Sequence, residues 1–202
     1  MTQPPEQPTP EREPLPRVLE AALHAFAEHG YHGTSIRDLA AAAGLSVPGL
    51  YHHHRSKQDV LVALMTAVQS DLVERVERAR DEAPDDPVAR FDAVVRVLLA
   101  FHIERRTEAF VASTEIRSLE PEHRTAYVAS RDRVQRVLDE AVEAGCAAGV
   151  MATPVAKEAS RAVSVLAIGL AGWYRTSGPL EPAELVERHL VLARALVGLP
   201  PS

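Results

Sequence analysis

The residues from Ser46 to Lys57 combine a glycine, a tyrosine and three histidines in a pattern suited to contact with nucleic acid. Gly49 carries no side chain, so the backbone there can approach a phosphate or a base edge closely. Tyr51 and His52 project beside it, as the side chains of a recognition helix would. This stretch is therefore a candidate element for binding DNA.

Two short helices joined by a tight turn are expected to position these residues. Thr34 or Ser35 suits an N-cap, and the IRDLAAAAG segment that follows has helical spacing. Gly44 predicts the turn, because glycine adopts positive φ without steric cost. Ser46 then caps a second helix, and Pro48 fits its first turn. The pattern is typical of a helix-turn-helix.

A further helix precedes this pair and is closed by Gly30. Its apolar stripe consists of Leu15, Leu19, Ala22, Leu23 and Phe26. The alternative is an ordinary helical hairpin within a helical core, but three helices in this order favour a DNA-binding head.

Three consecutive histidines, His52 to His54, raise the question of a metal site. Adjacent residues of a helix point about 100° apart and cannot converge on one ion. Neutral imidazoles that donate to phosphates, or that pack as polar aromatics, are the simpler interpretation. We therefore expect neither a metal nor a cofactor.

The chain has 202 residues and a net charge of −6, which argues against indiscriminate coating of nucleic acid. Residues 34–58 nevertheless carry Arg37, Arg55 and Lys57 against Asp38, so this window has a charge of +2 and the remainder −8. The basic patch coincides with the helix-turn-helix. Because it is modest, helix N-termini must share the phosphate binding, and affinity should fall as salt rises.

Residues 17–64 resemble the heads of the tetracycline-repressor (TetR) family, through the pattern AFAEHGYHGTSIRDLAAAAGLSVPGLYHHHRSKQDVL. The resemblance implies phosphate contacts by Thr34 and Ser35, assisted by Arg37, and by Lys57 at the next helix start. It places on the recognition helix Ser46, Val47, Pro48, Gly49, Tyr51 and His52. His54 departs from the family, which usually has an aromatic there, so the head could be less tightly packed or pH-sensitive.

Beyond the head, an all-α body is expected, because no alternating β-branched runs occur. One long helix should run from Ser56 to the break EAPDDP at 82–87 and link head to body. Others should follow near Phe91, from Thr107 to Leu119 and after Pro121, and the whole chain should have about nine helices in an orthogonal bundle. The expected domains are a disordered arm (1–14), the helix-turn-helix head (15–58), and a ligand-binding and dimerisation domain (59–202).

Apolar residues of the body could line an effector tunnel or simply form core, and arginines could meet an anionic group at its mouth. The candidates are Phe91, Leu98, Phe101, His102, Arg106, Phe110, Leu166 and Trp173. A histidine on an apolar stripe, such as His102, is more often a hydrogen-bonded core residue than a ligand contact. Cys146 is expected to be core filler rather than a redox sensor.

The last two helices are candidates for a dimer interface, because ASRAVSVLAIGLAGWYR is apolar around most of its circumference. The candidate interface residues are Val163, Leu170, Leu185, Leu192 and Leu196. Two copies would form a four-helix bundle and set two recognition helices on a palindromic operator, as in the resembled family. A monomeric helical core is the alternative.

The segments LEPEHR, EAGCAAGV and WYRTSGPLEPAEL also resemble C-terminal domains of the TetR subset that responds to acyl-coenzyme A. We predict a homodimeric transcriptional repressor that a small apolar effector, such as an acyl-coenzyme A thioester, releases from duplex operator DNA. Two alternatives to a repressor are a transcriptional activator and a helical adaptor that binds protein.

An enzyme is not expected, because the sequence lacks a P-loop, a G-x-S-x-G elbow and HExxH. No apolar run is long enough to cross a membrane, and a cytoplasmic protein, associated with the nucleoid when bound to DNA, is expected.

Overall fold

The computed structural model describes residues 14–175 and 178–200, and these form nine α-helices and one short 3₁₀ helix, without strands. In chain order they are α1 (Arg17–Gly33), α2 (Ile36–Ala42), α3 (Val47–His53), α4 (Lys57–Glu82), α5 (Pro87–Glu104), α6 (Arg106–Thr114), η1 (Glu115–Ser118), α7 (Pro121–Ala147), α8 (Ala156–Trp173) and α9 (Pro182–Leu196). The predicted all-α class is confirmed. The predicted arm lies, up to residue 13, outside the described residues.

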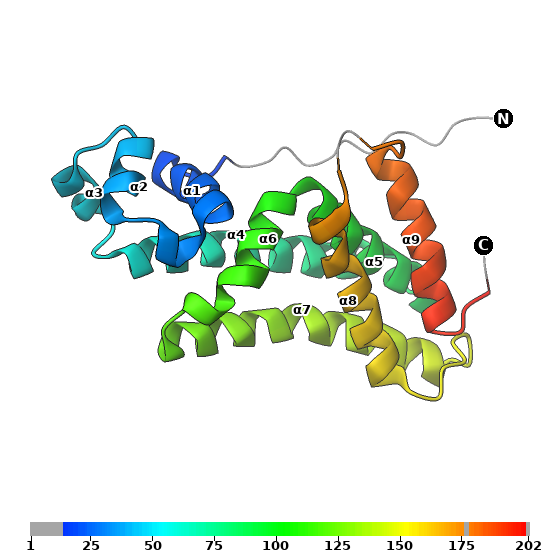
Figure 1. Cartoon of the computed structure of the whole chain (residues 1–202). Coiled ribbons are helices and arrows are strands. Elements are labelled where there is room, and N and C mark those ends of the chain that lie inside the picture. The colour runs from blue at the N-terminus through cyan, green and yellow to red at the C-terminus, as the bar shows by residue number, and fades with distance from the viewer. Residues whose placement is uncertain (1–13, 176–177, 201–202) are drawn as a thin grey trace.

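Helices α1 to α3 form a small head at one end of the molecule (Figure 1). Phe26, Leu39 and Leu50 are each at most 1% exposed, so each helix contributes to one shared core. Gly30 was expected to end the first helix, but α1 extends to Gly33 across a break at Gly30, where φ is +70°. That break turns the chain towards α2.

Helix α4 begins in the head and continues through the body (Figure 1). It ends at Glu82, where the sequence predicted a break, and Asp86 caps α5 by accepting a hydrogen bond from the Ala89 N–H at 2.7 Å. Inside the body, α4 packs against α5 and α7. One rigid element therefore connects the two parts of the protein.

Helix α5 lies at the centre of the body, in contact with α4, α7, α8 and α9. It ends at Glu104, and its C-cap, Arg105, is 6% exposed and donates to Asp71 of α4 at 2.8 Å. Arg105 also pairs with Glu108 of α6, at 3.4 Å. The segment predicted as one helix from Thr107 to Leu119 is divided into α6 and η1. Within the described residues, no helix is long and apolar enough to traverse a bilayer.

Candidate DNA interface and effector cavity

Serine caps define the starts of the two helices of the predicted helix-turn-helix. Ser35 Oγ accepts from the Asp38 N–H at 3.2 Å, and the Asp38 carboxylate accepts from the Ser35 N–H at 2.8 Å, which completes a capping box. Gly44 turns the chain at φ +66°. Ser46 Oγ then accepts from the Gly49 N–H at 3.1 Å. The caps fix the first turns of α2 and α3, and each serine oxygen accepts one hydrogen bond while its O–H can still donate.

Helix α3 presents its polar side chains to solvent. Tyr51 is 49% exposed, and His52 and Pro48 are exposed, while Val47 and Gly49 are half-buried. Arg37, on α2, is also exposed. The residues predicted to contact bases are therefore accessible together on one short helix.

Thr34 and Lys57 are bound inside the head. Thr34 is 2% exposed, its hydroxyl donates to the Gly30 carbonyl at 2.8 Å and its N–H donates to the Tyr31 carbonyl at 3.3 Å, so both of its donors are used within the head. Lys57 Nζ donates to the carbonyls of Tyr31 at 2.7 Å and Thr34 at 2.8 Å. It also lies 4.1 Å from the centroid of the Tyr31 ring. Lys57 thus ties the start of α4 to the end of α1, a role that the sequence pattern did not reveal.

A second tie lies beside Lys57. The Gln58 amide, oriented with its nitrogen towards Tyr31, donates to the Tyr31 hydroxyl at 3.0 Å and to the Ser118 carbonyl at 3.1 Å. Its oxygen accepts from the Glu120 N–H at 2.9 Å. The first turn of α4 therefore connects the head to the junction between η1 and α7.

The three histidines of the run differ in burial, because His52 and His53 are exposed. His54 is the C-cap of α3 and is half-buried, and this burial lowers the pKa of its imidazole below the ordinary range. Across residues 14–175 and 178–200, no cluster of three or more His, Cys, Asp or Glu side chains could hold an ion. The half-buried, neutral His54 fits the interpretation of a packed polar aromatic.

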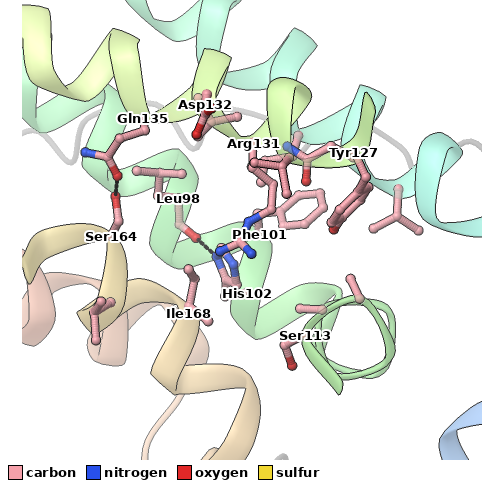
Figure 2. A pocket seen from close by; sticks show the side chains of 18 of the residues that line it. Leu98, Phe101, His102, Ser113, Tyr127, Arg131, Asp132, Gln135, Ser164 and Ile168 are labelled. Carbon is pink, nitrogen blue, oxygen red and sulfur yellow. Dashed lines mark hydrogen bonds between the residues drawn. The ribbon is translucent and has the colours of Figure 1, made fainter. Parts of the chain in front are cut away.

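The body contains a cavity of about 480 Å³ that is lined by helices α4 to α8 and is partly open to solvent (Figure 2). Its wall includes Val68, Gln69 and Leu72 of α4, and Tyr127, Arg131 and Gln135 of α7. A volume of this size is in the range of small-molecule sites. Among the residues predicted to meet a ligand, Leu98, Phe101 and His102 line this cavity.

The other five candidates lie outside the cavity wall. Phe91 is fully buried in the core, and Leu166 packs against that core. Arg106 donates to the Tyr174 carbonyl at 2.7 Å. Phe110 and Trp173 are 41% and 56% exposed at the surface. Because one side of each helix faces core, cavity or solvent according to its neighbours, an apolar stripe did not distinguish these positions.

His102 lies in the cavity wall in its neutral form. Its Nδ1 lies 2.7 Å from the Leu98 carbonyl, which can only accept, so Nδ1 carries the proton (Figure 2). Burial lowers the pKa of His102, and the nearby Arg131 guanidinium lowers it further. The free Nε2 can therefore accept a hydrogen bond.

The predicted dimer interface needs correction. Val163, Leu170 and Leu185 are at most 1% exposed and are buried within the protomer, because α8 and α9 pack on α5. Leu192 and Leu196 are 50% and 42% exposed. The other exposed apolar side chains of α8 and α9 are Val165, Trp173 and Val191. Val165 also lines the cavity, so we give the name α8–α9 face to the other four exposed side chains, Trp173, Val191, Leu192 and Leu196.

Comparison with known proteins matches both parts of the chain. Residues 18–64 match the family model "Bacterial regulatory proteins, tetR family", and residues 84–197 match "Tetracyclin repressor-like, C-terminal domain". The HTH-type transcriptional repressor KstR2 of Mycobacterium tuberculosis is 24% identical over 180 residues, 87% of this chain and 88% of KstR2.

Two solved structures share the fold over most of both chains. A tetR-family regulatory protein from Rhodococcus RHA1 is 28% identical, with a TM-score of 0.85 over 91% of this chain and 96% of that one. AibR, solved with isovaleryl coenzyme A and operator DNA, is 23% identical, with a TM-score of 0.79 over 91% of this chain and 97% of AibR.

Proposed function

The chain belongs to the tetR family of bacterial regulatory proteins, and on that premise we propose that it is a homodimeric repressor released from its operator by a small apolar effector. Residues 15–58 would bind DNA, and residues 59–202 would bind the effector and the second protomer. Acyl-coenzyme A thioesters are among the candidate effectors, since the AibR fold holds isovaleryl coenzyme A. The family consists of regulators, so no catalytic step is proposed, and we place the protein in the cytoplasm, on the nucleoid when bound to DNA.

The observation that carries this proposal is that α4 serves both sites. Its first residue, Lys57, holds the end of α1 beside the recognition element, and its Val68, Gln69 and Leu72 form part of the cavity wall. Lys57 and Gln69 are about 18 Å apart along the helix axis. A displacement of α4 by a bound effector would therefore move the head.

Effector and operator would then compete through linkage. An effector that prefers the DNA-incompetent arrangement by about 1–3 kcal/mol weakens operator binding about 5- to 150-fold. No covalent chemistry is required, because only the relative spacing of the two heads has to change.

The DNA contacts proposed for the head follow from exposure and charge. Tyr51 and His52 would reach base edges or phosphates, and Arg37 would meet the backbone of the duplex. A lysine ammonium has three N–H donors, and Lys57 uses two of them within the head. The third remains for a phosphate.

A fluorescence-anisotropy titration of duplex from the upstream intergenic region, at several salt concentrations, tests this function. Tyr51→Ala and Lys57→Ala should each cost about 1–3 kcal/mol of binding, and the Lys57 variant should reduce the salt dependence. Arg90→Ala, at an exposed ion pair with Asp85 in the body, is the matched control and should bind as the wild type does. Weak binding without salt dependence would instead favour a protein-binding adaptor.

A further inference from the structure

Some polar side chains of the cavity wall are hydrogen-bonded within the protein, and others are not. On one side, Gln135 Oε1 accepts from the Ser164 hydroxyl at 2.7 Å, and Gln135 Nε2 donates to Asp139 at 2.7 Å (Figure 2). Ser160 donates to the same carboxylate. These groups satisfy one another and need no ligand.

The second group consists of Gln69, Tyr127 and Arg131, which we call the open donor group. Gln69 is 6% exposed, and its Nε2 has no hydrogen-bond partner, although an unpaired buried amide is costly. Within the described residues, neither the Tyr127 hydroxyl nor the Arg131 guanidinium makes a hydrogen bond or ion pair to another protein group. Three sets of donors therefore border the same cavity without acceptors.

The three residues reach the cavity from two helices. Tyr127 and Arg131 are four residues apart on α7, so they share one face of that helix. Figure 2 shows Arg131 extending from α7 towards His102. Gln69 comes from α4, which packs against α7, and like Tyr127 it also lines a smaller neighbouring cavity of about 130 Å³. A ligand group between α4 and α7 could meet all three.

The charge state of the surrounding groups defines what the open donor group can bind. Burial raises the pKa of Tyr127, so its phenol keeps its proton and can donate. Burial lowers the pKa of His102, so that imidazole adds no second positive charge. Arg131 itself is exposed, and the exposed Asp132 and Arg161 are also part of the wall. One cation and two neutral donors of the open donor group thus border the same cavity as apolar side chains, and Arg161 is a second cation of the wall.

We propose, building on the function proposed above, that the effector is an amphipathic monocarboxylic acid whose carboxylate is bound by Arg131, Tyr127 and Gln69. A carboxylate accepts several hydrogen bonds at once and neutralises the guanidinium, whereas an alcohol or ester supplies no charge. The apolar part of the acid lies against Val68, Leu72, Leu98 and Phe101, which border the same space.

Isothermal titration calorimetry on the full chain, without DNA, tests this inference. The probes are octanoate, octanol, methyl octanoate and octanoyl-coenzyme A, with butyrate, palmitate and cholate, each beside its alcohol, to vary the apolar part. The acid of best-fitting size should bind at least about tenfold more tightly than its alcohol or ester, as expected for a charge-assisted pair.

Variants assign the preference to the open donor group. Arg131→Gln should abolish the preference for acid over alcohol, and Gln69→Leu and Tyr127→Phe should each weaken acid binding about fivefold. Arg136→Gln, an exposed arginine on the same helix that does not line the cavity, should leave both affinities unchanged. Circular dichroism melts of each variant establish that it is folded.

The inference is overturned if no acid binds more tightly than its alcohol, or if Arg131→Gln still prefers the acid to the alcohol. It is also overturned if the coenzyme A thioester binds more tightly than the acid in both the wild type and Arg131→Gln. Release of operator is measured separately by anisotropy. An acid that binds without releasing DNA leaves the carboxylate site standing and contradicts the effector-released repressor. Release of the operator by a ligand that is not an acid supports the effector-released repressor and contradicts a carboxylic acid as its effector.

Discussion

The head and the body differ in how far along the chain the partners of their important residues lie. In the head, the caps join residues three apart, as between Ser35 and Asp38 or Ser46 and Gly49. In the body, Arg105 meets Asp71 from 34 positions away, and the cavity wall draws on five helices. Local chemistry thus shapes the helix-turn-helix, whereas topology shapes the cavity. Lys57 and Gln58, which join α4 to Tyr31 of α1, are exceptions in the head.

The largest effect on operator binding is expected from a substitution that separates the two protomers of the dimer. Leu192→Glu places a charge in the α8–α9 face and should give monomers that bind operator about 10²- to 10⁴-fold more weakly, because the avidity of two linked heads is lost. Light scattering after size exclusion, together with anisotropy, measures both. Val150→Glu, at a similarly exposed valine after α7, is the control. A dimer that survives Leu192→Glu would place the interface elsewhere.

The long-range ion pairs of the body should matter more to stability than the local caps of the head. Arg105→Met removes the cation beside Asp71 and the buried Glu108, and should cost about 3–5 kcal/mol of unfolding free energy. Urea denaturation at fixed protein concentration measures this. Arg90→Met, which breaks the exposed pair with Asp85, should cost at most about 1 kcal/mol. Equal losses of unfolding free energy in Arg105→Met and Arg90→Met would show that the buried and exposed ion pairs contribute equally to stability.

The Lys57 exception in the head can be tested directly. Lys57→Met keeps the apolar stem but removes two charge-assisted hydrogen bonds to the end of α1, so the head should lose about 1–3 kcal/mol. Hydrogen exchange of the α1 and α2 amides should accelerate, while exchange in α7 should not. Unchanged exchange in the head would show that Lys57 contributes to DNA binding alone.

The purely local contacts should have smaller effects. Ser35→Ala breaks the capping box of α2 and should cost about 1 kcal/mol. Ser35→Asn preserves an N-cap acceptor and should retain most of the stability. Thermal melts of the pair provide the comparison, and an identical loss in both would mean that the cap is not the cause.

The smallest effect is expected from the pH dependence of the cavity. Because burial lowers the pKa of His102 below its ordinary 6.5, the unfolded chain takes up a proton there at higher pH than the folded chain does. The contribution of His102 to stability is therefore complete above about pH 6.5 and declines as the pH falls towards its folded pKa. Urea unfolding of wild type and His102→Gln at several pH values isolates this term. If the unfolding free energies of wild type and His102→Gln change in parallel with pH, the contribution of His102 is contradicted.

Much of the head was predictable because its signals are local. Gly44, Pro48 and the serine caps each act on the backbone within a few residues, so their positions in the sequence defined α2 and α3. The burial of the Thr34 hydroxyl was not predictable in this way, because its acceptors, the Ala25 and Gly30 carbonyls, become available only when the chain turns at Gly30.

Helix α9 shows most clearly what tertiary structure decided. Leu185 and Leu192 are seven residues apart and so share one side of α9, yet Leu185 is 1% exposed and Leu192 is 50% exposed. Periodicity identifies the apolar side of a helix, but only the neighbours packed at each turn determine whether that side meets core, cavity or solvent. By itself the sequence determined the helical class, the helix-turn-helix and the family. The placement of Gln69, Tyr127 and Arg131 around one cavity came from the packing of α4 against α7, because side chains so far apart in the chain meet only in the folded protein.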